Sequence, residues 1–422
     1  MTLAWKEGFE WALPNSSRFS GLYTLFQLMV AVTSGDQRSA LFRYLISLRA
    51  PEAHPVLNAL QLLLDFSVHV DSEPLARTAF LKALHRLSGG SELYPTILEH
   101  PTVPVARANL IQGAVGSFGQ VYMGSYEGKA VALKVAHRNK VLKTFYKEVV
   151  TWSNLSHDNV LPFYGVFSDQ EQHFVMVSPF MAKGNVRQYL QSHFPRVSGP
   201  RLLLIADIGS GLEYLHRMGI IHGDLKGDNI LVSDNGSACL ADFGISTVST
   251  DANKHLRLTH LSTAQSGTIA YQAPEILACE DMRTRLPLSD KSDVYSFACV
   301  CYEIMSMRVP FQAFSTSAIV LAVSRRKRPE KPAPTDVAVI NLGLNTRLWD
   351  LIERCWQQEP ERRPTVKDVR QDPIFDGLSD ERPTPYASGE LTAAQVRQNK
   401  IVVNLRAKPD DGFGLSFSST DD

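Results

Sequence analysis

The chain has 422 residues, of which 44% are hydrophobic and 20% are charged. This composition is ordinary for a globular protein and excludes disorder along the whole chain. Lysine plus arginine and aspartate plus glutamate both number 43, so no chain-wide charge would draw the protein onto nucleic acid or an anionic membrane. The length allows two or three folding units, or one large domain with extensions.

The cysteines and the start of the chain bear on its compartment. The five cysteines form no CxxC pair and no zinc-ligand spacing, and their odd number favours a reducing environment in which they stay free. The first residues, MTLAWKEGFEWAL, lack the basic segment, apolar run and small-residue cleavage site of a secretory signal. The longest apolar stretch, residues 22–32, is far shorter than the roughly 20 residues that span a bilayer. We therefore expect a cytoplasmic protein without a membrane span, with nuclear entry left open.

The first part of the chain has helical periodicity. Apolar side chains recur at i, i+3, i+4 and i+7, namely Phe80, Ala83, Leu84 and Leu87. Ser72 followed by Pro74 predicts the start of this helix, and Gly89-Gly90 predicts its end. We expect further helices over residues 21–33, 36–48 and 56–68. The pattern predicts a helical N-terminal region over residues 1–100, with a role in packing or protein docking.

A second domain is predicted after the prolines at positions 101 and 104. Two β-type runs follow this linker, at residues 120–123 and 130–135. Helical signals dominate from about residue 185 onward, interrupted by short β-type runs at residues 230–232 and 238–240. Strands followed by helices predict an α+β fold with two lobes over residues 105–370. Residues 377–422 are rich in Asp, Ser, Pro and Thr, so we expect a mostly disordered tail.

A glycine-containing turn lies between the β-type runs, with the sequence Gly116-Ser-Phe-Gly119-Gln-Val121. Glycines allow a hairpin backbone to approach phosphate oxygens closely and to offer amide donors without a side-chain clash, although an ordinary turn has the same pattern. Lys134 lies inside the next apolar strand, where a buried ammonium group needs an anionic partner. Glu148, on a predicted amphipathic helix over residues 145–155, is the expected partner.

The strongest signal is three runs in chain order, His222-Gly-Asp224-Leu-Lys226-Gly-Asp-Asn229, Asp242-Phe-Gly244 and Ala273-Pro-Glu275. Two acids and an amide at this spacing can hold magnesium and a hydroxyl around one phosphoryl group. With the glycine turn, strand lysine and helix glutamate before these runs, the chain resembles the eukaryotic protein kinases over residues 105–370. The run LSHDNVLPFYG at residues 155–165 is similar to the tyrosine-kinase-like group of serine/threonine kinases.

This resemblance implies a bilobal kinase fold with a small β-rich N-lobe and a larger helical C-lobe, and the use of ATP and Mg²⁺. Asp224 would orient the accepting hydroxyl, and Lys226 would reach the transferring phosphate. Asn229 and Asp242 would coordinate magnesium. The residues with implied catalytic roles are Lys134, Glu148, Asp224, Lys226 and Asn229.

The resemblance also implies a nucleotide site. Lys134 would contact the α- and β-phosphates, Pro179 would offer its carbonyl to adenine, and Met181 would donate its amide. Ser178 would leave the back of the pocket open. Ala114 departs from the family pattern, because it stands where the first glycine is usual and makes the loop tip less adaptable. The implied nucleotide contacts are Gly113, Ala114, Gly116, Ser117, Phe118, Gly119, Val121, Ala132, Lys134, Ser178, Pro179 and Met181.

Several residues match the structural positions of the family. Asp293 would brace the backbone of the catalytic loop, and Arg363 would pair with Glu275. We expect an internal stack rather than an acid–base group at four ring side chains, His222, Phe243, Trp152 and Phe163.

The resemblance predicts the acceptor class as well as the reaction. Lys226 and Thr268 both favour serine and threonine hydroxyls in protein substrates, so we expect a serine/threonine kinase in intracellular signalling. Gly223 replaces the arginine that usually precedes the catalytic aspartate, which removes a partner for a phosphorylated activation loop. A pseudokinase or scaffold with a kinase fold is the alternative, and a small-molecule phosphotransferase is a further rival.

Overall fold

The computed structural model describes residues 40–67, 74–99, 106–116, 119–126, 129–136, 142–168, 174–193, 200–248, 266–277 and 288–383. The chain divides into two compact units, one containing residues 40–98 and the other containing residues 99–383 of those described. The predicted helix over residues 21–33 and residues 384–422 of the predicted tail lie outside the described residues. The proposed domain boundaries stay predictions.

The first unit is helical. Its elements are α3 (Ala40–Ser47), α4 (Ala53–Ser67), α5 (Pro74–Ser91) and the short 3₁₀ turn η1 (Thr96–Leu98). The four apolar residues that predicted the last long helix, Phe80, Ala83, Leu84 and Leu87, are fully buried. The predicted helix is confirmed, but its burial is not limited to that face, because Leu81, Lys82, His85 and Ser88 are buried as well.

The predicted end of α5 at Gly89-Gly90 lies one residue before the observed end of the helix at Ser91. A Cβ atom added at Gly90 would lie 3.4 Å from the carbonyl oxygen of Ile46, at the end of α3. That distance is an ordinary van der Waals contact, so the packing around Gly90 does not itself require a glycine.

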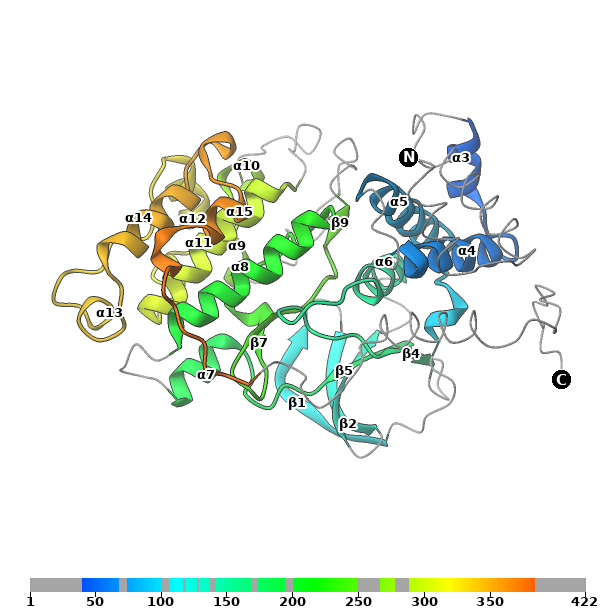
Figure 1. Ribbon diagram of the computed structural model, residues 1–422, viewed down its shortest axis with the longest axis horizontal. Coiled ribbons are helices and arrows are strands. Elements are labelled where there is room, and N and C mark those ends of the chain that lie inside the picture. The colour runs from blue at the N-terminus through cyan, green and yellow to red at the C-terminus, as the bar shows by residue number, and fades with distance from the viewer. Residues whose placement is uncertain are drawn as a thin grey trace. The chain divides into compact units, whose positions relative to one another are not determined.

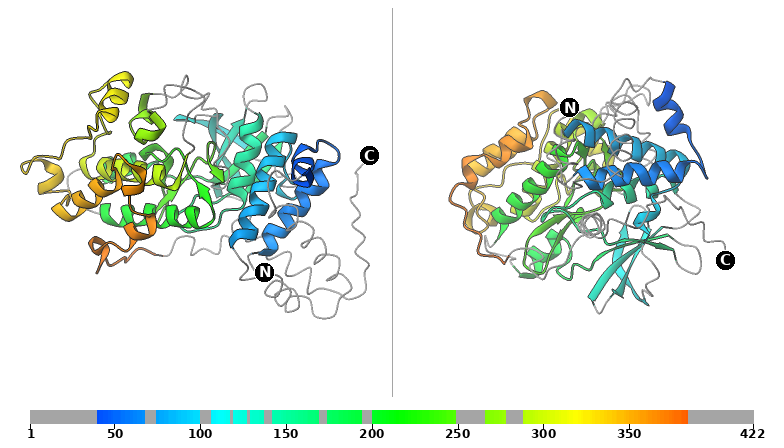
Figure 2. Two further views of the ribbon diagram at one scale, coloured as in Figure 1. Left: turned by 90° about the horizontal axis from the view of Figure 1, so that it is seen from above. Right: turned by 45° about the vertical axis from the view of Figure 1, so that its right-hand side comes forward.

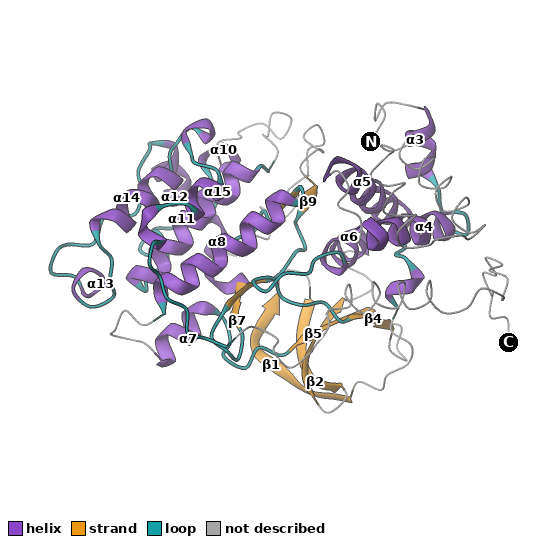
Figure 3. Cartoon of the chain, in the orientation of Figure 1, coloured by secondary structure: helices purple, strands orange, loops and turns teal. Residues whose placement is uncertain are grey.

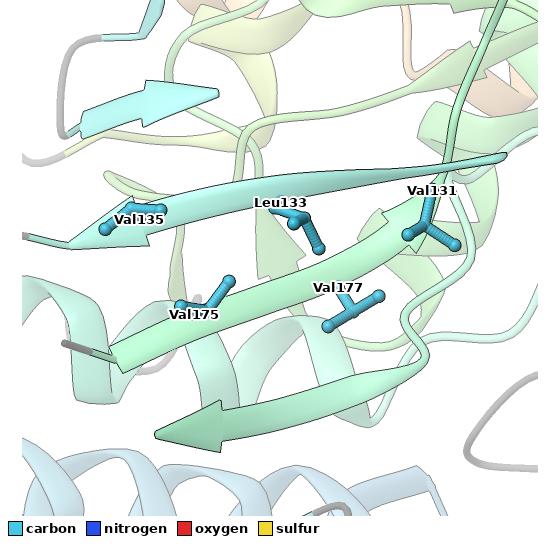
Figure 4. Packing of buried hydrophobic residues seen from close by; sticks show 5 residues of the cluster. All are labelled: Val131, Leu133, Val135, Val175 and Val177. Atoms are coloured by element: carbon cyan, nitrogen blue, oxygen red, sulfur yellow. The ribbon is translucent and has the colours of Figure 1, made fainter. Parts of the chain in front are cut away.

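The second unit begins with an antiparallel sheet. The described strands are β1 (Ala106–Gly116), β2 (Gly119–Tyr126), β3 (Lys129–Ala136), β4 (Gly165–Ser168) and β5 (Phe174–Pro179), and their order is β1-β2-β3-β5-β4. Helix α6 (Leu142–Ser153) separates β3 from β4 in the chain. Alternate residues of β3 and β5 point to one face and form an apolar cluster of Val131, Leu133, Val135, Val175 and Val177 (Figure 4).

Helices follow the sheet in the chain (Figure 1). They are α7 (Val186–His193), α8 (Arg201–Arg217), α9 (Ser266–Ile269), α10 (Pro274–Leu277), α11 (Asp290–Ser306), α12 (Thr316–Ser324), α13 (Val337–Ile340), α14 (Thr346–Cys355) and α15 (Val366–Arg370). Helix α11 is buried from Ser292 to its last residue, so it forms the centre of this region. Ser289 caps it by accepting a hydrogen bond from the backbone amide of Ser292.

Two small antiparallel pairs lie among these helices. One joins β6 (Ile220–Ile221) to β9 (Thr247–Val248), and the other joins β7 (Ile230–Val232) to β8 (Ala238–Leu240). Within the second unit, strands β1–β5 and helices α7–α15 occupy separate regions in each view (Figures 2 and 3). A β-rich lobe followed by a helical lobe confirms the predicted α+β fold.

The cysteines and the helix lengths agree with two further expectations. The described cysteines, Cys239, Cys299, Cys301 and Cys355, are buried and free, as predicted, while Cys279 lies outside the described residues. None of the described helices combines the length and the apolar content needed to cross a membrane.

Candidate active site

Lys134 is placed by the register of the sheet. It pairs with Val121 of β2 and Met176 of β5, and it lies on the opposite face of β3 from the apolar cluster. Its ammonium nitrogen is 2.6 Å from Oε1 of Glu148, on α6, and 2.8 Å from Oδ1 of Asp242. The predicted partnership with Glu148 is therefore formed, and Asp242 is a second anionic partner.

Burial and charge act in opposite directions at these three residues. Burial alone would lower the pKa of Lys134, but the two carboxylates outweigh it and raise the pKa above its usual value. Burial raises the pKa of Glu148 to about 7, with the charge of Lys134 opposing this shift. Burial also disfavours the charged form of Asp242, yet Lys134 holds the pKa of Asp242 below its usual value. Lys134 and Asp242 therefore both stay charged at neutral pH.

The loop after β6 holds Asp224 in a fixed position. Lys226 donates from Nζ to Oδ2 of Asp224 at 2.8 Å and to Oγ1 of Thr268 at 2.9 Å. Asn229 donates from Nδ2 to the backbone oxygen of Asp224 at 2.8 Å and to its Oδ2 at 3.0 Å. Burial raises the pKa of Asp224, while the positive charge of Lys226 acts against the increase. Within the described part of the chain both side-chain donors bind Oδ2 of Asp224 and not its Oδ1.

The β7–β8 hairpin brings Asn229 and Asp242 to the same end. Asn229 ends the 3₁₀ turn η2 (Gly227–Asn229) just before β7, and Asp242 follows β8 by two residues. The backbone amide of Ala241 donates to the carbonyl oxygen of Asn229 at 2.9 Å, which joins the two segments next to these side chains. Because Nδ2 of Asn229 binds Asp224, its oxygen Oδ1 is the atom available to a cation.

The oxygen atoms of Asn229 and Asp242 suit magnesium, because this ion needs few protein ligands and no cage made of protein groups alone. No group of three or more His, Cys, Asp or Glu residues in the described ranges could hold a metal ion. Mg²⁺ usually takes one or two protein oxygen ligands and completes its shell with phosphate oxygens and water. The amide oxygen of Asn229 and the carboxylate of Asp242, which lies beside Lys134, satisfy that requirement.

Asp293, near the start of α11, binds the backbone of the loop that follows β6. It accepts hydrogen bonds from the backbone amides of His222 at 2.8 Å and Gly223 at 2.9 Å. Its Oδ2 also lies 2.9 Å from Nε2 of His216. This geometry confirms the predicted bracing role of Asp293.

The predicted aromatic stack is formed. Ring centroids are 5.1 Å apart for Trp152 and Phe163, 6.1 Å for Trp152 and Phe243, and 5.5 Å for His222 and Phe243. His222 is fully buried in this stack, and its Nε2 lies 3.2 Å from the carbonyl oxygen of Ala241. His222 therefore has a packing role, as expected.

One buried acid next to the catalytic loop was not anticipated. Glu303 of α11 accepts hydrogen bonds from the hydroxyl of Tyr271 and from Nε of Arg187, both at 2.7 Å. A Cβ atom added at Gly227 would lie 2.7 Å from Cδ of Glu303, so only glycine allows this carboxylate so close to the loop. A glutamate in the mostly apolar second half of α11 was the signal in the sequence, because such a charge needs partners.

The nucleotide-contact residues lie partly within the described backbone. Ala132 pairs with Ser178 across β3 and β5, and the amide of Phe180 donates to the carbonyl of Ala130 at 3.2 Å. The carbonyl of Met181 accepts from the amide of Gly184. These bonds fix the connection that follows β5, but the adenine contacts themselves stay predictions.

The glycine turn is described only along its backbone. Gly116 pairs with Gly119 where β1 and β2 meet, and the β1–β2 register shifts between Leu110 and Val115, around Gly113 and Ala114. Ser117 and Phe118, at the tip of the turn, lie outside the described residues. Their phosphate contacts also stay predictions.

A family model described as protein tyrosine and serine/threonine kinase matches residues 111–372. Serine/threonine-protein kinase STY17 of Arabidopsis thaliana is 30% identical over 262 residues, which cover 61% of this chain and 42% of the relative. Serine/threonine/tyrosine-protein kinase HT1 of the same plant is 31% identical over 267 residues, which cover 61% of this chain and 63% of the relative.

A third relative comes from a different organism. Dual specificity protein kinase shkC of Dictyostelium discoideum is 32% identical over 263 residues, covering 60% of this chain and 48% of the relative. The chain thus spans less than two thirds of the length of these curated relatives. Because the family model covers more than half of the chain, the chain belongs to the protein tyrosine and serine/threonine kinase family.

Proposed function

We propose that the protein is a serine/threonine protein kinase that transfers the γ-phosphate of ATP to hydroxyl groups of other proteins in intracellular signalling. Membership of the family implies the use of ATP and of protein substrates. The observation that carries the proposal is the contact of Lys226 with both Asp224 and Thr268. This contact connects the residue that would orient the hydroxyl to the segment that precedes the Ala273-Pro-Glu275 run.

Each charged group near this contact has a separate task in the proposal. Asp224 accepts a hydrogen bond from the substrate hydroxyl and directs its oxygen at the γ-phosphorus. Lys226 stabilises the charge on the transferring phosphoryl group, and Lys134 holds the α- and β-phosphates. Asn229 and Asp242 would hold magnesium, which supplies charge neutralisation at the phosphate oxygens when it is bound.

Lys134 changes partner in this scheme. Its ammonium group binds Glu148 and Asp242 in the structure described here. In this proposal Lys134, on β3, keeps its contact with Glu148 of α6, and phosphate oxygens would replace its bond to Asp242. Asp242 would then be free to act as a metal ligand.

The nucleotide contacts belong to the same proposal. Adenine would lie against the connection after β5, with the carbonyl of Pro179 as acceptor and the amide of Met181 as donor. The buried Ser178 adds little volume behind the base. The backbone of residues 113–119 would cover the phosphates, with Val121 and Ala132 lining the base from the sheet. Protein docking by the N-terminal helices and a cytoplasmic location complete the proposal.

The direct test is phosphoryl transfer from radiolabelled ATP to a generic protein acceptor in the presence of Mg²⁺. We expect incorporation by the wild-type protein and loss of most of it in Asp224→Asn, which keeps the shape of the side chain but removes the carboxylate. ATP binding by Asp224→Asn should be retained. Wild-type protein that binds ATP but transfers no phosphate would instead identify a pseudokinase.

The acceptor class is tested on the products. Acid hydrolysis followed by phosphoamino-acid analysis should give phosphoserine and phosphothreonine, because Lys226 and Thr268 match the serine/threonine pattern. Predominant phosphotyrosine would contradict this part of the proposal while leaving the phosphoryl transfer itself intact.

A further inference from the structure

The described chain continues past the region that the family model matches, which ends at residue 372. We call residues 373–383 the C-terminal strap. It begins with the 3₁₀ turn η5 (Pro373–Phe375) and continues without regular structure to Pro383. Figure 1 draws the strap in orange-red, running from the helical end of the second unit past α7 toward β7.

Arg382 fastens the strap. Its Nη1 and Nη2 donate to Oδ2 and Oδ1 of Asp207, on α8, at 2.8 and 3.0 Å, and Nη1 also donates to the carbonyl of Gly236 at 2.9 Å. Its Nε and Nη2 donate to the carboxylate of Asp380 at 2.8 and 2.7 Å. All five N–H groups of the guanidinium are therefore used, in a planar arrangement that lysine cannot reproduce.

These contacts converge on the turn of the β7–β8 hairpin. Asp207, which receives Arg382, also accepts from the backbone amide of Ala238, the first residue of β8, at 2.9 Å. The side-chain amide of Asn235, within the turn, donates to the carbonyl of Pro383 at 2.6 Å. Gly236 has a φ of +89°, and a Cβ atom there would lie 3.8 Å from Cδ of Arg382. The strap therefore holds the turn from outside.

The opposite end of the same hairpin carries Asn229 and Asp242. Its strands pair through three residue pairs only, Ile230 with Leu240, Leu231 with Cys239 and Val232 with Ala238. Neighbouring backbone also holds the hairpin, because Leu240 bonds to Asn159 and Leu161 and the amide of Val232 donates to the carbonyl of Gly184. The Asn159 side chain also holds β8, by donating to the carbonyl of Ala238 at 3.1 Å, so Arg382 shares this task.

We infer that Arg382 is a positioning residue for the phosphoryl-transfer site, because it fixes the far end of the hairpin whose near end presents Asn229 and Asp242. The inference rests on the proposed function for the role of those two residues. The anchoring of the hairpin by Arg382 is independent of that function, because it follows from the hydrogen bonds of the folded chain.

The test compares Arg382→Ala and Arg382→Lys with a matched control, Arg370→Ala. Arg370 also forms an ion pair with α8, through Glu213, but this pair is more exposed and does not contact the hairpin. The test measures amide hydrogen exchange of the full chain. It also measures, by calorimetry, the affinity for Mg²⁺ in the presence of a non-hydrolysable ATP analogue. Neither measurement requires catalysis.

Arg382→Ala should speed amide exchange at Ala238 and its neighbours in the hairpin about tenfold, as expected from the loss of charged hydrogen bonds. It should also weaken Mg²⁺ binding about threefold or more. Arg382→Lys keeps the charge and should lie between wild type and Arg382→Ala, and it remains informative if Arg382→Ala does not fold. Arg370→Ala should change neither quantity.

Two outcomes would overturn the inference. One is amide hydrogen exchange that rises equally in α8, α11 and the hairpin while Mg²⁺ binding is unchanged. Arg382 would then stabilise the fold as a whole and would not position the site. The other is that the Arg382 variants behave like Arg370→Ala. A protein that shows the expected exchange and Mg²⁺ effects but transfers no phosphate would contradict the proposed function alone.

Discussion

Replacing Arg363 by alanine should be among the most destabilising single changes in the second unit. The guanidinium of Arg363 has no exposed side-chain area and binds both carboxylate oxygens of Glu275 at 2.7 Å. Its remaining N–H groups donate to the carbonyls of Gln357, Lys291 and Gln358 at 2.8, 2.8 and 3.2 Å. The substitution removes the arginine that binds the Glu275 carboxylate, whose side chain is 7% exposed, and also removes these further donors.

The size of the effect follows from burial. Breaking a buried, hydrogen-bonded ion pair by removing one partner typically costs about 3–5 kcal/mol. A domain has a total stability of only about 5–15 kcal/mol, so this is a large fraction of it. At roughly 2–4 °C per kcal/mol for a domain of this size, the melting temperature should fall by about 6–20 °C.

The assay is thermal unfolding followed by circular dichroism, with Arg308→Ala as the matched control. Arg308 pairs with Asp336 at 2.9 Å but is half exposed, and such pairs contribute about 0–1 kcal/mol. The double variant Arg363→Met/Glu275→Gln should be less destabilised than the two single effects added together, because neither charge is then left unpaired. A melting temperature of Arg363→Ala no lower than that of Arg308→Ala would refute the reasoning.

Two further changes act closer to the transfer site. Lys134→Met should lower kcat/KM for ATP by about a hundredfold or more, because it removes a phosphate contact and leaves Glu148 and Asp242 without their shared cation; unchanged efficiency in steady-state assays would mean that another lysine contacts the phosphates. Gly227→Ala should force the catalytic loop away from Glu303 and lower both kcat and the melting temperature, with a stability loss of about 1–3 kcal/mol; wild-type values for both would show that the loop has spare room.

The sequence was most informative where chemistry and local periodicity agree. The alternation of apolar residues around Lys134 fixed both the strand and the face of the lysine, and the need for an anionic partner pointed to Glu148. The aromatic stack and the Asp293 brace were predictable because the motif resemblance assigned them residue by residue. In α5 the spacing of apolar residues predicted the helix, and the glycine pair predicted its end to within one residue.

Contacts between distant parts of the chain were not predictable in the same way. Arg187 and Glu303 are 116 residues apart, and Arg382 and Asp207 are 175 residues apart. Each partner is an ordinary charged residue in its own segment, and only the folded chain brings the two together. The average composition of the tail therefore could not predict that one of its residues, Arg382, binds the carboxylate of Asp207.

Gly223 shows how a residue type and its backbone angle together bear on regulation. Its φ is +80°, its amide donates to Asp293, and a Cβ atom there would lie 2.7 Å from Cδ1 of Leu288. An arginine at this position would give a phosphorylated activation loop a charge-assisted partner, with about 1–3 new hydrogen bonds. Glycine supplies no such group, so phosphate on that loop gains nothing from position 223.

The protein should therefore keep most of its activity without phosphate on the segment between Asp242 and Glu275. Candidate acceptors there are Ser262, Thr263 and Ser266. Phosphatase treatment followed by a kinetic assay should change kcat by less than about threefold, since no charge-assisted bonds are lost at position 223. Gly223→Arg restores the guanidinium, and Gly223→Ala is its matched control, because both place a side chain at a φ of +80° and against Leu288. Only Gly223→Arg should make activity depend on phosphorylation. A loss of a hundredfold in the wild-type protein, reversed by phosphorylation at one of these residues, would mean that a different cation orders the segment, and the argument from Gly223 would then fail.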